Sequence, residues 1–359
     1  MNSHLLAPAN SLKTKTNSPY RVFTPFARAM VDSGATSVDK LSANPQGALK
    51  SPKTWPDTLS VKALPLDSRT RSGADWAAGF GAFTPGEKGA HRALDHFIAH
   101  GLHTYADGRD RPDQDGTSRL SAHLRFGEIS VRRVLYQIDN AARHDVRLRE
   151  GAAKFRSEIL WREFCYGLLM QQPRLHGVNF RRDFDDFPWL EDDKGFKAWT
   201  RGQTGYPLVD AGMRQLWRTG WMHNRVRMVV ASFLVKHLLI DWRRGEQWFW
   251  DCLVDADPAN NPANWQWVAG CGADAAPYFR IFNPISQAEK FDPKALYRSE
   301  FVPEFRARTG DLFDGAGAGT ANATYPKPIV DHDFARKRAL GAFQDMRSHR
   351  ELDHDADPD

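Results

Sequence analysis

The stretch from Asp210 to Trp267 holds the most informative residues of the chain, and it reads DAGMRQLWRTGWMHNRVRMVVASFLVKHLLIDWRRGEQWFWDCLVDADPANNPANWQW. It combines an apolar helix, a polar face on that helix, two closely spaced carboxylates and a run of tryptophans. Apolar residues such as Val226 and Val230 recur at helical spacing. The pattern predicts a helix over 221–239 with one side buried in a core.

The polar face of this predicted helix contains Asn224, Arg225, Arg227 and Met228. At about 100° per residue these positions form one continuous arc rather than a scatter around the helix. Two arginines beside an amide and a thioether could hold an anion or a planar ring. The alternative is a surface arc that pairs with acids elsewhere in the chain.

Two carboxylates follow, Asp255 and Asp257, with Pro258 directly after them. A proline disfavours the α region for the residue before it, so we expect an extended segment there. In an extended segment both side chains point the same way, towards one receiving group. Solvated loop acids are the alternative.

The composition indicates a globular protein, with 41% hydrophobic and 26% charged residues in a chain of 359. Its formal net charge is +5. The last nine residues, ELDHDADPD, carry five acids and no lysine or arginine, so the remainder carries +10. A basic balance of this kind points towards polyanions such as nucleic acid.

Three cysteines, at positions 165, 252 and 271, have neither a CxxC motif nor the spacing of a zinc site, so no metal centre is expected. The start of the chain lacks the pattern of a secretory signal. No apolar run approaches the ~20 residues of a membrane span. We therefore expect a cytoplasmic protein, and a monomer.

The chain divides into three parts by composition. Residues 1–76 are rich in Ser, Thr, Pro and Ala and predict linker and loops, whereas 77–347 shows helical patterns. The last helix is expected at 334–347, and 348–359 is an acidic tail that we expect to be disordered. Neither a strand pattern nor a repeat is found in the sequence, so the expected fold class is all-α.

The run TSRLS at 117–121 predicts a helix start capped by Thr117 or Ser118, and a second helix is expected after a cap at Ser130. Free backbone N–H groups beside hydroxyls and Arg119 would make a good phosphate seat. An ordinary helix cap is the alternative.

The sequence GAAKFRSEILWREFCYGLLMQQP, at 151–173, predicts one long helix that closes before Pro173. Glu158, Trp161 and Arg162 are spaced i, i+3 and i+4 and therefore share a face. This face could belong to a binding site, or it could be a surface Glu–Arg pair beside a core tryptophan.

Ten of the twelve tryptophans lie between Trp161 and Trp267. Tryptophan fills apolar cores, stacks on nucleobases and donates single electrons. Most core architectures do not need such a concentration of tryptophan, and chance clustering in a helical core is the alternative.

The motifs TSRLS, ILWREF, GWMHNRVRM, DADPANN and NWQWVAG occur here in the order found in the flavin-binding half of the DNA photolyase/cryptochrome family, which the chain resembles. It is most similar to bacterial cyclobutane pyrimidine dimer photolyases. The segment PYRVFTPFARAM from Pro19 resembles the end of the family's N-terminal α/β antenna domain, but the βαβ pattern of that domain is missing before it. Either the chain is truncated or its start codon is misassigned.

This resemblance implies an all-helical FAD-binding domain at 77–347 and assigns roles to individual residues. The residues implied in FAD binding are Tyr105, Thr117, Ser118, Arg119, Leu120, Ser121, Arg162, Asn224, Arg227, Asp255, Asp257 and Asn261. An ion pair between Arg227 and Asp255 is expected. The implied catalytic residues are Trp265, Trp242 and Trp189, as a chain of electron donors, together with Glu158 and Asn261. The residues implied to face DNA and the lesion are Glu158, Trp161, Arg225, Met228 and Trp267.

The implied activity is blue-light repair of cyclobutane pyrimidine dimers in DNA by reduced FAD, without an antenna chromophore. Enzymes that repair (6-4) photoproducts resemble one another in two cavity histidines, and the matching positions here are Asn224 and Met228. The alternatives are a cryptochrome-type blue-light sensor and a truncated, inactive flavoprotein.

Overall fold

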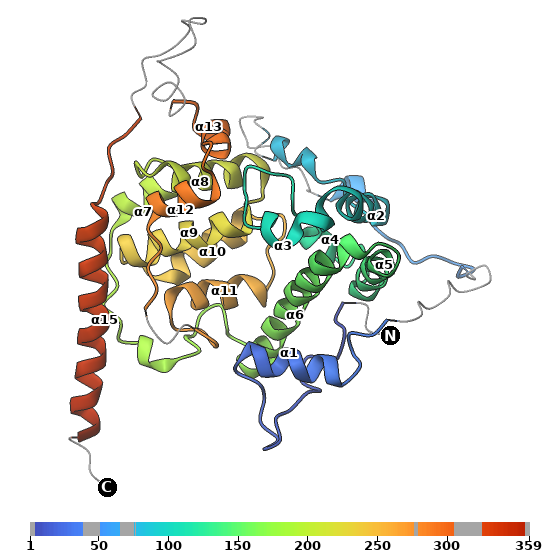
Figure 1. Cartoon of the computed structure of the whole chain (residues 1–359), viewed down its shortest axis with the longest axis horizontal. Helices are drawn as coiled ribbons and strands as arrows, with labels where there is room; N and C mark the ends of the chain where they lie inside the picture. Colours follow the sequence, from blue (N-terminus) through green and yellow to red (C-terminus); the bar gives the residue numbers. More distant parts are fainter. Residues whose placement is uncertain are drawn as a thin grey trace, which may run out of the picture.

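The computed structural model describes residues 4–38, 51–64, 75, 77–275, 279–304 and 325–355. Within these ranges the chain forms helices and loops and no β-strand, as expected from the sequence (Figure 1). Much of the predicted linker and the last four residues of the acidic tail lie outside the described residues.

The first half of the chain forms one group of helices. They are α1 (Phe23–Asp32), α2 (Glu87–His96), α3 (Tyr105–Gly108), α4 (Ser121–Arg125), α5 (Val131–His144) and α6 (Arg149–Gln171). Short 3-10 or π turns accompany them, η1 (Val61–Ala63), η2 (Ala78–Ala82), η3 (Phe97–Gly101), η4 (Leu102–Thr104) and η5 (Val146–Leu148).

The second half begins with η6 (Arg182–Phe184) and continues with α7 (Asp193–Thr200), α8 (Pro207–Thr219), α9 (Asn224–Ser232), η7 (Phe233–His237), α10 (Trp242–Cys252), α11 (Asn260–Ala269), α12 (Pro284–Phe291), α13 (Leu296–Phe301) and α15 (His332–Asp355). The central helix α8 begins with Pro207 in its first turn and ends at Gly220, whose left-handed φ of 68° suits a glycine.

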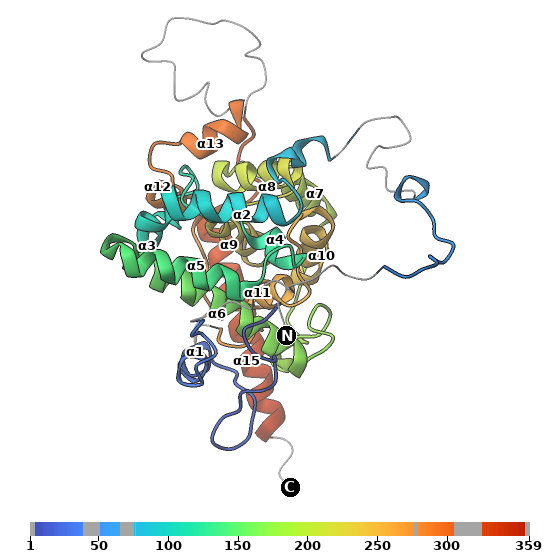
Figure 2. The same ribbon diagram turned by 90° about the vertical axis from the view of Figure 1, so that its right-hand side faces the viewer.

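Two apolar cores hold these halves. One is built from the helices between 184 and 346, and the other from residues 6 to 175 with Ala259 and Ala263 added. Helix α11 contacts both α10 and α6, so it bridges the two cores. Figures 1 and 2 show α6 crossing the body, with α1 against it and α15 along one edge.

Helix α1 corrects the expectation that the first 76 residues are linker and loops. Phe26 and Met30 of this helix are buried against α6, and Leu6 joins the same core. The residues before position 39 show little helical periodicity in the sequence. The packing shows that residues before 39 belong to the helical body.

The C-terminal helix also departs from the predicted bounds. It begins at His332 and runs to Asp355, beyond the expected end at 347 and into the predicted disordered tail. The helix is anchored near its start, where Nε2 of His237 lies 2.8 Å from Nδ1 of His332. Side chains such as Ala335 and Ala339 are buried there.

Candidate flavin and DNA site

The TSRLS loop lies between α3 and α4. Helix α4 begins at Ser121 without a side-chain cap, so the expected cap at Thr117 or Ser118 is wrong. The reason is local: Arg119 has a left-handed φ of 51°, and Oγ of Ser118 accepts instead from the backbone N–H of Leu120 at 3.4 Å. The expected cap at Ser130 is confirmed, since its Oγ accepts from the next helix.

The backbone of this loop retains unused donors. Among the described residues, the N–H groups of Thr117, Ser118, Arg119 and Ser121 donate to no acceptor. Leu120 is buried and fixes the loop from inside, while the guanidinium of Arg119 lies 5.0 Å from the ring of Trp221. Unpaired amides beside an arginine are what a diphosphate requires.

Tyr105 and Glu158 both contact Arg109. Arg109 pairs with the carboxylate of Glu158 at 2.8 Å and lies over the ring of Tyr105. Burial, and then the charge of Glu158, raise the pKa of Tyr105 to about 12, so its hydroxyl stays a hydrogen-bond donor. The sequence did not identify Arg109 as this partner, although Arg109 directly follows α3.

Arg162 contacts the N-terminal segment rather than Glu158. Its guanidinium donates to the backbone oxygen of His4 at 2.8 Å and lies 3.4 Å from Glu163. The side chain of His4 is 2.7 Å from the hydroxyl of Tyr166, which donates to Asp257 at 2.7 Å. A polar chain therefore links residue 4 to the second of the two spaced carboxylates.

The expectation of one receiver for Asp255 and Asp257 is wrong. Asp255 accepts from Arg227 at 2.9 and 3.1 Å, which confirms the expected pair. Asp257 instead accepts from Tyr166 and from the backbone N–H groups of the first turn of α11. The two side chains diverge because α11 starts so soon after Pro258 that Asp257 becomes part of its cap.

The predicted polar face starts at the first turn of α9. The helix begins at Asn224 rather than at 221 because Nδ1 of His223 accepts from the backbone N–H of Arg225 at 3.2 Å. Asn224 is exposed, and Arg225 and Met228 are half-buried. Arg225 pairs with Asp110 at 2.7 Å.

His223 was not among the predicted site residues. Burial lowers its pKa to about 4, and its Nε2 is buried without a hydrogen-bond partner among the described residues. It is therefore neutral near pH 7. Its position before a helix start was the signal that could have identified it as the cap.

The three tryptophans predicted as electron donors lie in or against the core built between residues 184 and 346. Trp265 and Trp242 are buried and Trp189 is half-buried. Among the described residues, the rings that contact Trp265 are Trp199 at 6.2 Å and Phe249 at 5.0 Å between centroids. No ring contact joins two members of the predicted three-tryptophan chain, which stays a prediction.

The two tryptophans predicted to wall a lesion cavity have partners of their own. Trp161 stacks on Phe23 of α1, with centroids 3.7 Å apart and planes 6° apart. Trp267 donates from its indole nitrogen to the backbone oxygen of Asp274 at 3.2 Å. Both residues are half-buried.

Residues 155–345 match the FAD binding domain of DNA photolyase. A deoxyribodipyrimidine photo-lyase of Agrobacterium fabrum is 51% identical over 354 residues, which cover 94% of this chain and 71% of that protein. This chain belongs to the DNA photolyase/cryptochrome family.

Solved structures of family members show the same fold. A bacterial class III photolyase from Agrobacterium tumefaciens has a TM-score of 0.84 and 49% identity, over 96% of this chain and 72% of that one. An archaeal photolyase from Sulfolobus tokodaii with two FAD molecules, described as implying a novel light-harvesting cofactor, has a TM-score of 0.67 and 31% identity, over 95% and 70%. The predicted all-α fold of the photolyase FAD-binding domain is confirmed.

The family's FAD fits what this chain presents. Unused amides lie in the TSRLS loop, and the side-chain oxygen of the buried Asn261 accepts from no donor among the described residues. The Arg227–Asp255 pair is buried at its carboxylate, which is 3% exposed. These groups can bind an anionic diphosphate and accept hydrogen bonds from the N–H donors of a ring.

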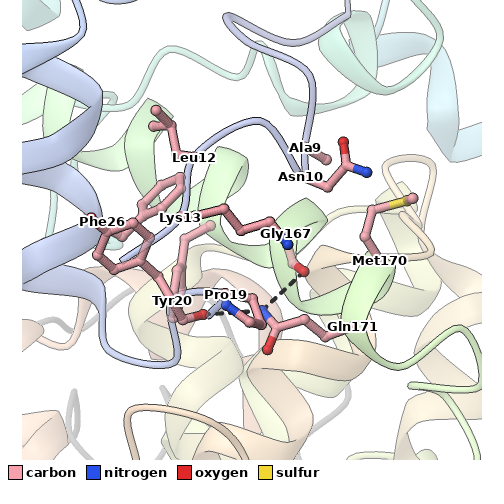
Figure 3. A pocket seen from close by; sticks show the side chains of 11 residues that line it. Ala9, Asn10, Leu12, Lys13, Pro19, Tyr20, Phe26, Gly167, Met170 and Gln171 are labelled. Carbon is pink, nitrogen blue, oxygen red and sulfur yellow. Dashed lines mark hydrogen bonds between the residues drawn. The ribbon is translucent and has the colours of Figure 1, made fainter. Parts of the chain in front are cut away.

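A separate cavity of about 270 Å³ lies between the N-terminal segment and the last turns of α6 (Figure 3). Tyr20, Phe26, Phe164 and Met170 are among the residues that line it, and none of the predicted site residues does. Within the described ranges there is no group of three or more side chains suited to a metal ion. None of the described helices is long and apolar enough to cross a bilayer.

Proposed function

We propose that the protein is a deoxyribodipyrimidine photo-lyase, which repairs cyclobutane pyrimidine dimers in DNA under blue light. The observation that carries this proposal is the 51% identity to a protein of that name over nearly the whole chain. It is supported by the FAD-binding match and by the geometry of the Arg227–Asp255 pair.

FAD, when bound in its reduced form, would supply the excited electron that splits the dimer and is then returned. The chain's contribution is to bind and orient it. The loop amides at 117–121 and Arg119 would hold the diphosphate, with Arg162 near it and the hydroxyl of Tyr105 as a further donor. Asn224, Asp257 and Asn261 would contact the flavin, with Asp255 held by Arg227 below the ring system.

The lesion side is proposed at Glu158, Trp161, Arg225, Met228 and Trp267. Photolyases extrude the damaged nucleotides from the duplex, and the half-buried indoles offer flat apolar walls. Met228 and Asn224 cannot deliver a proton near neutral pH, and the neighbouring His223 is neutral because burial lowers its pKa to about 4. This favours the cyclobutane dimer over the (6-4) photoproduct, whose repair needs a proton.

The deciding experiment illuminates reduced enzyme with oligonucleotides that carry one lesion of either kind and resolves the products by chromatography. Cyclobutane dimers are expected to be restored in the light only, and (6-4) products to persist. Loss of dimers in the dark, or restoration of the (6-4) lesion, would contradict the assignment. A blue-light sensor would bind FAD without turnover, and an inactive remnant would bind little FAD.

The absence of an antenna, the monomeric state and the cytoplasmic location remain predictions for this chain. An action spectrum tests the first: repair should follow the absorption of reduced flavin. An additional band that transfers energy to the flavin would show that the 359-residue chain holds a second chromophore.

A further inference from the structure

The indole nitrogen of Trp242 begins a short chain of side-chain hydrogen bonds. Trp242 is fully buried at the start of α10, and its Nε1–H donates to Oδ1 of Asn179 at 2.8 Å. The amide nitrogen of Asn179 donates in turn to Oδ1 of Asp185 at 2.8 Å. An indole nitrogen can only donate and a carboxylate can only accept, so one orientation of the amide satisfies both. The chain therefore leads from the buried indole to the exposed Asp185.

This arrangement differs from that of the other described tryptophans. Trp199 and Trp267 donate from their indole nitrogens to backbone oxygens, at 3.1 and 3.2 Å. Trp265 and Trp189 donate from theirs to no acceptor among the described residues. A backbone oxygen would be enough to satisfy a buried indole. A side-chain amide backed by a carboxylate at Trp242 therefore needs a reason beyond packing.

The ring face of Trp242 has a different electrostatic environment from its N–H edge. The guanidinium of Arg243 lies 4.9 Å from the ring centroid, and Asp241 pairs with that guanidinium at 2.8 Å. The face thus offers no net negative charge to the ring. The N–H edge does, because the oxygen of Asn179 is polarised by the carboxylate behind it. A fixed dipole of this kind stabilises a positive charge that develops on the indole.

We infer that Asn179 and Asp185 are positioning residues for electron transfer, which stabilise the positive charge of Trp242 after it has given up an electron. The inference rests on the proposed function, with FAD bound, and on the predicted order of donors. Trp265 gives one electron to the photoexcited oxidised flavin, and Trp242 gives one to the oxidised Trp265. Trp189 then restores Trp242 with one electron, and an external thiol restores Trp189. The indole proton of Trp242 stays on its nitrogen throughout.

Loss of an electron makes the indole N–H of Trp242 more acidic and therefore a stronger donor. Its bond to Asn179 then becomes charge-assisted, in a buried site where such bonds are strong. The positive charge is stabilised on Trp242 relative to Trp265, which has no described acceptor for its N–H. The chain therefore favours transfer of the electron towards the flavin over its return.

The test is illumination of the whole chain with oxidised FAD and a thiol, with flavin reduction followed by visible absorption. Asn179→Leu removes the acceptor and should slow photoreduction about tenfold, the size of one lost charge-assisted hydrogen bond. Dimer repair by enzyme reduced beforehand with dithionite is the reference, so the ratio of photoreduction to repair should fall. Asp185→Asn should act in the same direction but less. Its matched control is Asp186→Asn, an exposed neighbour outside the chain, which should change nothing.

A second readout needs no flavin. In the nitrogen-labelled chain without FAD, the indole N–H resonance that disappears in Trp242→Phe belongs to Trp242. Because a short hydrogen bond moves such a proton resonance downfield, it should shift upfield in Asn179→Leu. It should keep its position in Asp186→Asn.

The outcomes separate this inference from its premises. If Trp242→Phe blocks photoreduction but Asn179→Leu, with full FAD occupancy, does not slow it, the positioning role is wrong and the donor order stands. Normal photoreduction in Trp242→Phe overturns the donor order and the inference with it. Should Asn179→Leu not fold, equal photoreduction rates in Asp185→Asn and Asp186→Asn overturn the inference. A chain that photoreduces FAD but repairs no dimer counts against the proposed function alone.

Discussion

At the scale of single residues, the Arg227–Asp255 pair gives the most direct test of the site. Arg227→Ala would leave the Asp255 carboxylate, 3% exposed, without its partner and would remove a second bond to the backbone oxygen of Met222. Breaking a buried ion pair from one side costs about 3 kcal/mol. We expect a loss of that order in the free energy of unfolding, measured by denaturant titration.

The matched control for this pair is the double variant Arg227→Ala/Asp255→Asn. It removes the uncompensated charge, so it should recover part of the lost stability. Equal stability of the wild type and Arg227→Ala would show that the pair contributes nothing, whatever its geometry.

Trp265 is the predicted electron donor that can be tested most directly. Trp265→Phe keeps an aromatic ring against Trp199 and Phe249 but removes the easily oxidised indole. With oxidised FAD bound and a thiol present, illumination should no longer reduce the flavin, as followed by its visible absorption. Trp242→Phe serves as the comparison. Normal reduction of the flavin in the Trp265 variant would mean that electrons reach the flavin by another route.

At the scale of elements, α10 and α11 approach closely at Gly245. A Cβ atom there would lie 2.2 Å from Cη2 of Trp265 and 2.6 Å from Cδ2 of Leu234. Gly245→Ala should therefore cost about 1–3 kcal/mol by overpacking. Thermal unfolding of this variant can be compared with Gly341→Ala in α15, where no atom lies within 4 Å and an alanine should stabilise by roughly 0.5–1 kcal/mol.

The attachment of α15 should weaken in acid. His237 is buried against His332, and burial, with the charges of His332 and Arg338, lowers its pKa from 6.5 to about 3. Between those values the unfolded chain binds the proton and the native state does not. The stabilisation is complete above about pH 6.5 and is lost as the pH falls towards 3.

His237→Gln isolates this contribution, because Gln keeps a nitrogen donor but does not titrate. The free energy of unfolding of the wild type, minus that of the variant, should fall on acidification with a slope of up to ~1.4 kcal/mol per pH unit. A difference that stays constant from neutral to acidic pH would show that His237 does not control the stability in acid.

The sequence predicted the long helices well, and it failed where tertiary contacts set an end. The 23-residue helix α6 followed from its pattern. The start of α9 did not, because the His223 cap outweighed the apolar residues before it. The contact of Glu246 carried no signal in the sequence, since its partner Asn261 lies in another helix. The partners Arg109 and His4 depend likewise on how distant segments meet.

The two cores meet at α11, so the proposed flavin and lesion residues come from both halves of the chain. Tyr105, Glu158 and Arg162 belong to the first half, and Arg225 and Asp255 to the second. The Arg225–Asp110 ion pair joins the halves directly, at 2.7 Å. If Arg225 also contacts DNA as proposed, the stability of this junction and the binding of DNA depend on the same charge.

Arg225 is the basic residue that we propose to contact DNA. Its side chain is 17% exposed and lies 4.4 Å from the ring of Phe291, so it is held in place rather than free. If it also contacts a phosphate, Arg225→Ala should weaken binding to damaged and undamaged DNA alike. The slope of log affinity against log salt should become about one unit shallower.

The double variant Arg225→Ala/Asp110→Asn separates this contact from the release of a negative charge. Because a lost phosphate contact cannot be restored by neutralising Asp110, the double variant should keep the weaker binding and the shallower slope. Recovery to the wild-type affinity would show that Arg225 acts only by masking Asp110.

Trp161→Ala is the counterpart, and it should weaken binding to damaged DNA selectively, by ~1–3 kcal/mol, because a stacking wall acts only on an extruded base. Fluorescence anisotropy with matched damaged and undamaged duplexes, over a range of salt concentrations, measures all three variants. If Trp161→Ala weakened binding to both duplexes equally, its stacking partner would be Phe23 alone.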